Sequence, residues 1–80
     1  MLIRKGNELL NDGDIEKAEK IFVTTAYKDG LIRIGDYYYF DQKNVFKALN
    51  LYLEAKYEKR IRELTERMAL VLKNWLNEGN

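Results

Sequence analysis

The sequence contains no cysteine, no histidine and no proline. Without cysteine, the chain can form no disulfide, no thiolate metal site and no cysteine nucleophile. Without histidine, it lacks the commonest general base and metal ligand of proteins. The chain also shows no glycine loop of the kind that binds phosphate, and no pairing of a nucleophile with a base. We therefore expect a noncatalytic protein with no metal and no cofactor.

Long apolar runs and an excess of one charge are missing as well. No run approaches the ~20 residues of a membrane span, and the opening MLIRKGNELLNDGD lacks the apolar core of a signal peptide. The 14 basic and 13 acidic residues leave a net charge of +1, whereas a dedicated nucleic-acid binder usually shows a clear basic excess. We expect a cytoplasmic protein whose partner is a protein or peptide rather than a membrane or a nucleic acid.

Two segments of the chain repeat each other at a constant spacing. They read DIEKAEKIFVTTA from Asp14 and NVFKALNLYLEAK from Asn44, and each begins with a good N-cap residue. Their apolar or small positions follow helical steps of three and four. These positions are Ile15, Ala18, Ile21, Phe22 and Thr25 in the first copy and Val45, Ala48, Leu51, Tyr52 and Ala55 in the second.

The segments that precede these copies also match. Gly6 stands three residues before Leu9, and Gly35 stands three residues before Tyr38. The second copy has one more residue in its connection and no equivalent of Gly13, which can adopt a left-handed backbone. A third start is formed by Met68, Ala69 and Leu72. The small residues at Gly6, Gly35 and Ala69 would let a neighbouring helix approach closely.

The absence of proline and the helical periodicity predict one all-α domain over residues 1–80. Helices are expected at about 2–11, 15–27, 31–41, 45–57 and 60–78. They form a first hairpin over about 2–27, a turn at Lys28–Gly30, a second hairpin over about 31–57 and a C-terminal helix. Two points stay open. The fourth and fifth helices could fuse, and IFVTTAYKDGLIRI could instead form a β-hairpin around Asp29 and Gly30.

The two copies, GNELLNDGDIEKAEKIFVTT and GDYYYFDQKNVFKALNLYLEA, resemble the tetratricopeptide repeat. The resemblance lies in G-x-x-(L/Y) on the first helix and A-x-x-x-(F/Y) on the second. The chain departs from the family pattern in lacking the first-helix tryptophan and the closing proline. Its repeat spacing, from Asp14 to Asn44, is also shorter than the usual ~34 residues.

This resemblance implies a protein-interaction module that holds a partner peptide or helix in a groove lined by its first helices. The aromatic run YYYF is then explained, because the first helix of a middle repeat is covered on several sides. Tyr38 would lie in the hairpin core, Tyr37 would pack toward a neighbouring hairpin, and Tyr39 and Phe40 would face the groove. In the alternative, all four rings simply pack. The implied groove positions are Ile3, Asn7, Leu10, Arg33, Asp36, Tyr39, Phe40, Arg67, Leu70, Lys73 and Asn74.

The C-terminal helix carries an apolar stripe that suggests a second contact surface. A terminal helix of a repeat array needs a polar outer face, yet ERMALVLKNWLNEGN is rather apolar. We expect this helix to make the protein a homodimer or homo-oligomer, or to dock another protein. The alternative is that Trp75 merely closes the core. The assembly surface would consist of Met68, Leu72, Trp75 and Leu76.

Two rival functions remain. The segment ALNLYLEA from Ala48 also resembles the microtubule-interacting-and-trafficking domain, a three-helix module that binds helical tails. Alternatively, the chain is a small RNA or ribonucleoprotein accessory whose binding would fall steeply with added salt. This second function would use Arg33, Lys56, Lys59, Arg60 and Arg62 with nearby tyrosines.

Overall fold

Residues 2–78, the part of the chain that the computed structural model describes, form helices joined by short turns and contain no strand. The all-α prediction is confirmed, and the alternative of a β-hairpin around Asp29 and Gly30 is wrong. The elements are α1 (Leu2–Asn11), α2 (Ile15–Thr25), α3 (Lys28–Asp36), the π-helix η1 (Tyr37–Asp41), α4 (Val45–Ala55) and α5 (Glu58–Glu78).

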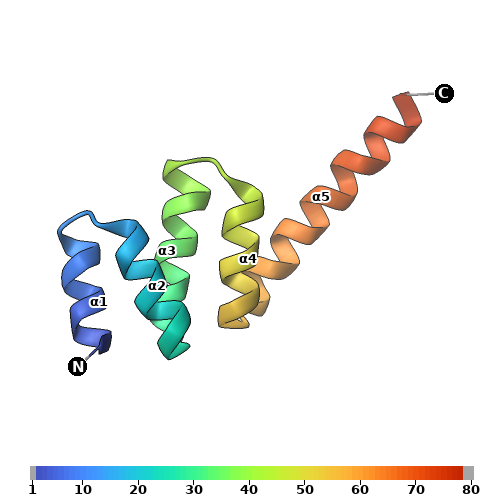
Figure 1. Ribbon diagram of the computed structural model, residues 1–80. Helices are drawn as coiled ribbons and strands as arrows, with labels where there is room; N and C mark the ends of the chain where they lie inside the picture. The colour runs from blue at the N-terminus through green and yellow to red at the C-terminus, as the bar shows by residue number, and fades with distance from the viewer. Residues whose placement is uncertain (1, 79–80) are drawn as a thin grey trace.

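The helices follow one another in an elongated row measuring 55 × 21 × 15 Å (Figure 1). Helices α1 and α2 form one antiparallel hairpin, and α3 with η1 pairs with α4 to form the next. The hairpins meet where α2 packs against α3. Helix α5 contacts α4 near its own N-terminus and then slants away, so that its C-terminal half extends beyond the other helices.

The turns inside the two hairpins repeat the same backbone geometry at equivalent positions of the two copies. The Asp14 carboxylate accepts a hydrogen bond from the Lys17 amide at 3.3 Å, and the Asn44 side chain accepts one from the Lys47 amide at 3.2 Å. These N-caps satisfy amides that have no partner within the helix. The residue before each cap has a positive φ, which is 87° at the predicted Gly13 and 56° at Lys43.

The second helix of each hairpin ends at a left-handed residue. Ala26 has φ 53° and its counterpart in the second copy, Lys56, has φ 55°. Helices α2 and α4 therefore end at residues 25 and 55, two residues earlier than predicted. Lys56 also separates α4 from α5, so the two helices do not fuse, and α5 begins at residue 58 rather than 60.

The predicted turn at Lys28–Gly30 is wrong, because these residues form the first turn of α3. The chain turns earlier, at Ala26 and Tyr27, where the left-handed residue has already reversed its direction. Gly30 has a different role. A Cβ placed on it would lie 2.5–2.7 Å from three ring atoms of Phe22.

A fully buried aromatic ring against glycine forms the centre of each hairpin. Phe22 packs against the backbone of both Gly6 and Gly30, and Tyr52 packs against Gly35. The sequence pattern predicts close approach at Gly6 and Gly35, and both are buried. A second tyrosine lies beside each ring, at centroid distances of 5.7 Å for Phe22 and Tyr27 and 5.9 Å for Tyr52 and Tyr57.

The extra residue of the second copy coincides with the π-helix. The distance from Gly6 to the cap Asp14 is eight residues, while that from Gly35 to Asn44 is nine. Over η1 the backbone widens, and the Gln42 amide donates to the Tyr37 carbonyl, five residues back, at 3.2 Å. A π-turn takes up one additional residue without breaking the helix. The caps and the core therefore keep their positions despite the insertion.

We predict that Gly30→Ala lowers the free energy of unfolding. Alanine is favoured over glycine in a helix by about 1 kcal/mol, but overpacking a core costs about 1–3 kcal/mol, and the Phe22 ring here is fully buried. Urea unfolding followed by circular dichroism measures the difference. Lys28→Ala, at an exposed position of the same turn, is the control and should change stability by less than about 0.5 kcal/mol. A Gly30→Ala variant as stable as the wild type would contradict the packing described.

Candidate functional site

The first candidate surface is a hollow between α1 and the second hairpin. Arg33 on α3 donates a hydrogen bond to the Asn7 side-chain oxygen on α1 at 3.3 Å. Beside this contact lies a hollow of about 280 Å³. Five predicted groove residues thus come together, namely Asn7, Leu10, Arg33, Asp36 and Phe40. The hollow is lined by Leu10, Arg33, Asp36, Tyr37, Phe40 and Asp41.

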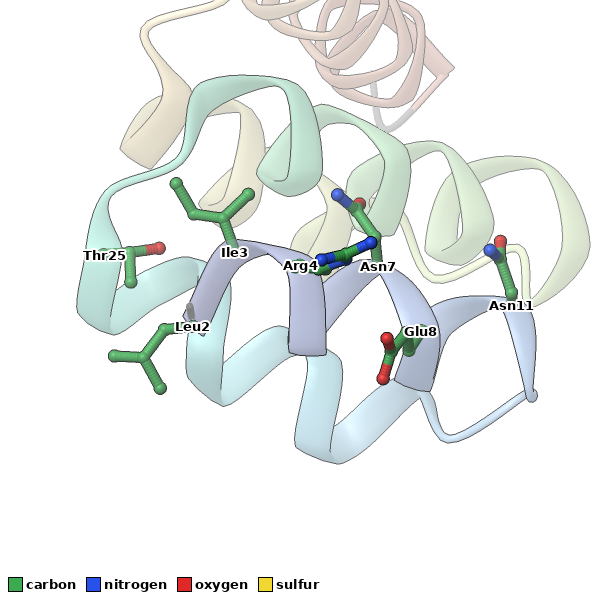
Figure 2. A pocket seen from close by; sticks show the side chains of 7 residues that line it. All are labelled: Leu2, Ile3, Arg4, Asn7, Glu8, Asn11 and Thr25. Atoms are coloured by element: carbon green, nitrogen blue, oxygen red, sulfur yellow. The ribbon is translucent and has the colours of Figure 1, made fainter.

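A wider depression of about 570 Å³ extends along α1 (Figure 2). All but one of its lining side chains come from α1, and Thr25 closes it from the end of α2. Leu2 and Ile3 form an exposed apolar end, and the remaining lining residues are polar or charged. This surface contains Ile3 and Asn7, which the resemblance placed in the groove.

The aromatic run is held by an arginine of α5. The guanidinium carbon of Arg60 lies 5.4 Å from the ring centre of Tyr39, 5.3 Å from that of Phe40 and 5.8 Å from that of Tyr52. A guanidinium over aromatic faces at this distance is a favourable cation–π contact. Arg67, one of the predicted groove residues, donates a hydrogen bond to the Tyr39 hydroxyl.

Arg60 also joins a charged cluster. Its Nη1 donates to Glu63 at 2.8 Å, and its Nη2 lies 4.0 Å from the Asp36 carboxylate. Its buried Nε has no hydrogen-bond partner among the described residues. The guanidinium of Arg60 therefore contacts groups of its own chain and connects η1, α4 and α5. The sequence does not indicate that Arg60 connects these helices, because its contacts with Asp36, Tyr39 and Phe40 join residues that lie far apart in the sequence.

The four aromatic neighbours fall into different environments. Tyr38 packs against the buried residues around Phe22 and against those around Tyr52, as predicted for a core position. Tyr37 lines the α1-facing hollow, and its hydroxyl accepts a hydrogen bond from Gln42 at 2.9 Å. Phe40 is half exposed, while Tyr39 is partly covered by the two arginines. The four rings are therefore neither all buried in the core nor all exposed on the surface.

The second candidate surface is an apolar groove of about 580 Å³ between α4 and α5. Helix α4 supplies one wall, including Phe46, which is 75% exposed. Helix α5 supplies the other wall as it slants away (Figure 1). The sequence does not indicate the α4 wall, because the repeat pattern marks Val45 only as a core position. The lining residues are Val45, Phe46, Leu64, Arg67, Met68, Ala69, Val71 and Leu72.

The predicted assembly residues lie along this groove and beyond it. Met68 and Leu72 line it, and Trp75 and Leu76 continue the stripe toward the end of α5. Trp75 is 68% exposed, so the alternative that it closes the core is wrong. The physical reason is the tilt of α5, which takes its C-terminal half away from α4. Ala69 is exposed as well, so the close helix approach predicted at this residue does not occur within residues 2–78.

The remaining predicted groove residues do not reach the hollow near α1. Leu70 and Lys73 are exposed on the part of α5 that extends away from the hairpins, and Asn74 shares that segment. The structure thus separates the predicted groove positions into two surfaces. One joins Asn7 and Arg33 across α1 and α3, and the other is the projecting α5. The prediction that Tyr39 faces the same groove as Phe40 is wrong, because Tyr39 packs against Arg60 and Arg67 of α5.

Comparison with known proteins gives one informative relative. An uncharacterized protein of Treponema pallidum (strain Nichols) is 37% identical over 73 residues, which cover 91% of this chain and 69% of the relative. The chain therefore belongs to the same family as this Treponema protein. No protein-family model and no solved structure matches the chain.

Two further observations bear on the kind of site. Across residues 2–78, none of the helices combines the length and the apolar character needed to cross a membrane. Within the same range, no three acidic side chains gather in a way that could hold a metal ion.

We predict an alkaline loss of stability that depends on Tyr52. Burial, followed by the hydrogen bond that its hydroxyl donates to Asp36 at 2.6 Å, raises the pKa of Tyr52 well above its ordinary value. The stabilisation is complete below about pH 10, where the unfolded tyrosine is protonated. It is lost as pH rises further, because the unfolded chain releases this proton first.

The measurement is urea unfolding of wild type and Tyr52→Phe from pH 7 to 11. At pH 7 the variant should be less stable by about 1.5–3 kcal/mol, the range for a hydrogen bond to a charged group. The difference in the free energy of unfolding between wild type and Tyr52→Phe should narrow above about pH 10. Tyr37→Phe, which removes a hydroxyl bonded to exposed Gln42, is the control and should change the stability at pH 7 by less than about 0.5 kcal/mol. A stability difference that does not change with pH would contradict the conclusion that Tyr52 causes the alkaline loss of stability.

Proposed function

We propose that this protein is a noncatalytic protein-interaction module that binds an amphipathic helix in the groove between α4 and α5. The observation that carries the proposal is the apolar lining of this groove, which combines Phe46, Val71 and Leu72, all more than half exposed. Large contiguous apolar patches on a soluble protein usually mark interaction sites.

The shape of the groove favours a helical occupant. Its walls are one side of α5 and the first two residues of α4, Val45 and Phe46. The two helices diverge from a common end (Figure 1). A third helix that inserts apolar residues at i, i+3, i+4 and i+7 fills such a space. Arg67 also lines the groove, where its guanidinium contacts Tyr39.

The hollow beside Arg33 is the secondary surface of this proposal. Its volume is about half that of the α4–α5 groove, and charged and polar groups line much of it. Arg33 is accompanied there by Asp36 and Asp41, so the hollow suits an extended peptide that offers both a carboxylate and a basic group. The larger and more apolar groove supplies more buried area, so we assign the main partner to it.

The tetratricopeptide-like character and the cytoplasmic location remain parts of this proposal. The recurrence of caps, left-handed residues and buried rings at equivalent positions of the two copies supports the repeat architecture. The sequence, which lacks cysteine and histidine, supports a binding rather than a catalytic role.

The test is selection of binding peptides from a random displayed library on sparsely immobilised protein. We expect enriched peptides with apolar residues at helical spacing. Val71→Glu should weaken their binding at least about ten-fold, because it places a charge in the apolar groove.

Leu70→Glu is the matched control. It introduces the same charge at the adjacent residue, which is similarly exposed but does not line the groove, and binding should be retained. Enrichment of peptides that bind both variants equally, or of none at all, would refute the assignment of the groove.

A further inference from the structure

The row of helices contains two junctions of the same kind, one where α3 meets α1 and one where α5 meets the second hairpin. Asn7 and Asp36 stand at equivalent positions, one residue after the glycine of each copy. The Asn7 side-chain oxygen lies 3.3 Å from Nη1 of Arg33 on α3. The Asp36 Oδ1 lies 4.0 Å from Nη2 of Arg60 on α5. Each junction therefore brings an arginine of the later helix to the residue after the glycine.

The second junction shows which chemistry such a space accepts. Tyr39 and Phe40 of η1 lie there with Asp36, and the guanidinium carbon of Arg60 is 5.4 Å and 5.3 Å from the two ring centres. The guanidinium carbon of Arg67 lies 6.0 Å from the ring centre of Tyr39. Aromatic rings beside a carboxylate attract a guanidinium through cation–π and ionic contacts together. At this junction, arginines of the chain itself occupy the space.

At the first junction the corresponding space is open and forms the hollow of about 280 Å³. Its lining again combines two aromatic rings, those of Tyr37 and Phe40, with two carboxylates, those of Asp36 and Asp41. Phe40 belongs to both junctions, and 51% of its surface is exposed although Arg60 lies over its ring. The hollow thus presents the same chemical groups as the second junction.

Arg33 lines the hollow but leaves its carboxylates unpaired. Its Nη1 donates to the neutral Asn7 side chain, and within residues 2–78 it forms no ion pair with Asp36 or Asp41. Asp41 is exposed and forms no ion pair at all in that range. Both internal contacts of Asp36 use Oδ1, which leaves Oδ2 for a ligand. Two carboxylates against one guanidinium give the hollow an excess of negative charge.

We propose that this hollow binds an arginine side chain of a partner peptide, with its guanidinium beside Asp36 and Asp41 and against the rings of Tyr37 and Phe40. The inference rests on the proposed protein-interaction function and defines the ligand of its secondary surface. Arginine fits better than lysine, because a planar guanidinium stacks on a ring and offers a carboxylate two donors at once.

The size of the hollow agrees with a single side chain. Its volume of about 280 Å³ lies just below the ~300–1,000 Å³ of typical small-molecule pockets. A helix, with a diameter of about 10 Å including its side chains, does not enter such a space. The hollow and the α4–α5 groove therefore select different features of a partner.

The first test is an NMR titration with a blocked Ala-Arg-Ala tripeptide. We expect it to shift the ring signals of Tyr37 and Phe40 with a dissociation constant of about 1 mM, a modest affinity that suits one anchored side chain. The control peptide carries citrulline, which keeps the shape of arginine and removes its charge. It should bind at least about five-fold more weakly, and added salt should weaken the arginine peptide.

The second test changes one carboxylate of the hollow. Asp41→Asn should weaken the arginine peptide at least about three-fold, because it removes a charge that the fold does not use. Asp12→Asn is the matched control. Asp12 stands at the equivalent position of the first copy, is also exposed and does not line the hollow, so this variant should bind like the wild type.

Three results would overturn the inference. Ring signals of Tyr37 and Phe40 that stay unmoved by the arginine peptide would do so. Equal binding of the citrulline peptide, or equal effects of Asp41→Asn and Asp12→Asn, would do so as well, because each shows that the carboxylates of the hollow do not recognise a guanidinium.

The proposed function of the α4–α5 groove fails separately. If library peptides bind that groove while the arginine peptide leaves the two rings unmoved, the groove assignment stands and the arginine site falls. If the arginine peptide binds and no helical peptide is enriched, the hollow is the binding site and the groove assignment falls.

Discussion

The architecture depends on one contact repeated twice, a fully buried aromatic ring against the backbone of glycine. Phe22 touches Gly6 and Gly30, and Tyr52 touches Gly35. The absence of a Cβ at these glycines brings the first and second helices of each hairpin close enough to bury the ring completely. Gly30 adds a contact between hairpins, because it brings α3 against the ring of α2. Both the hairpins and their stacking therefore rest on the same side-chain-to-backbone fit.

Much of this fold could be predicted from the sequence, because N-cap residues and the spacing of apolar residues mark the repeat locally. Asp14 and Asn44 mark helix starts, and the spacing of Ala18 with Phe22 and of Ala48 with Tyr52 marks the buried faces. The helix ends were harder to place. Ala26 and Lys56 take left-handed conformations that their residue types do not favour, so propensity pointed to Gly30 as the turn instead.

The candidate site was predicted less completely, since it depends on how helices sit relative to one another. The stripe of α5 follows from periodicity, and so do Met68, Leu72, Trp75 and Leu76. The groove does not, because its second wall is Phe46 and its depth depends on the angle between α4 and α5. The place of Arg60 among three aromatic rings likewise arises from tertiary contacts. No spacing within one helix encodes such contacts.

The left-handed Lys56 has a mechanical consequence for the groove. It is the point at which α5 departs from α4, and the 21 residues of α5 form a lever about 30 Å long. A rotation of about 10° at this pivot would displace the far end of α5 by about 5 Å, the pitch of one helical turn. The width of the groove therefore depends on the backbone at Lys56 and on the contacts of Arg60 that hold the start of α5 to η1 and α4. Farther along α5, the hydrogen bond from Arg67 to Tyr39 of η1 restrains this rotation.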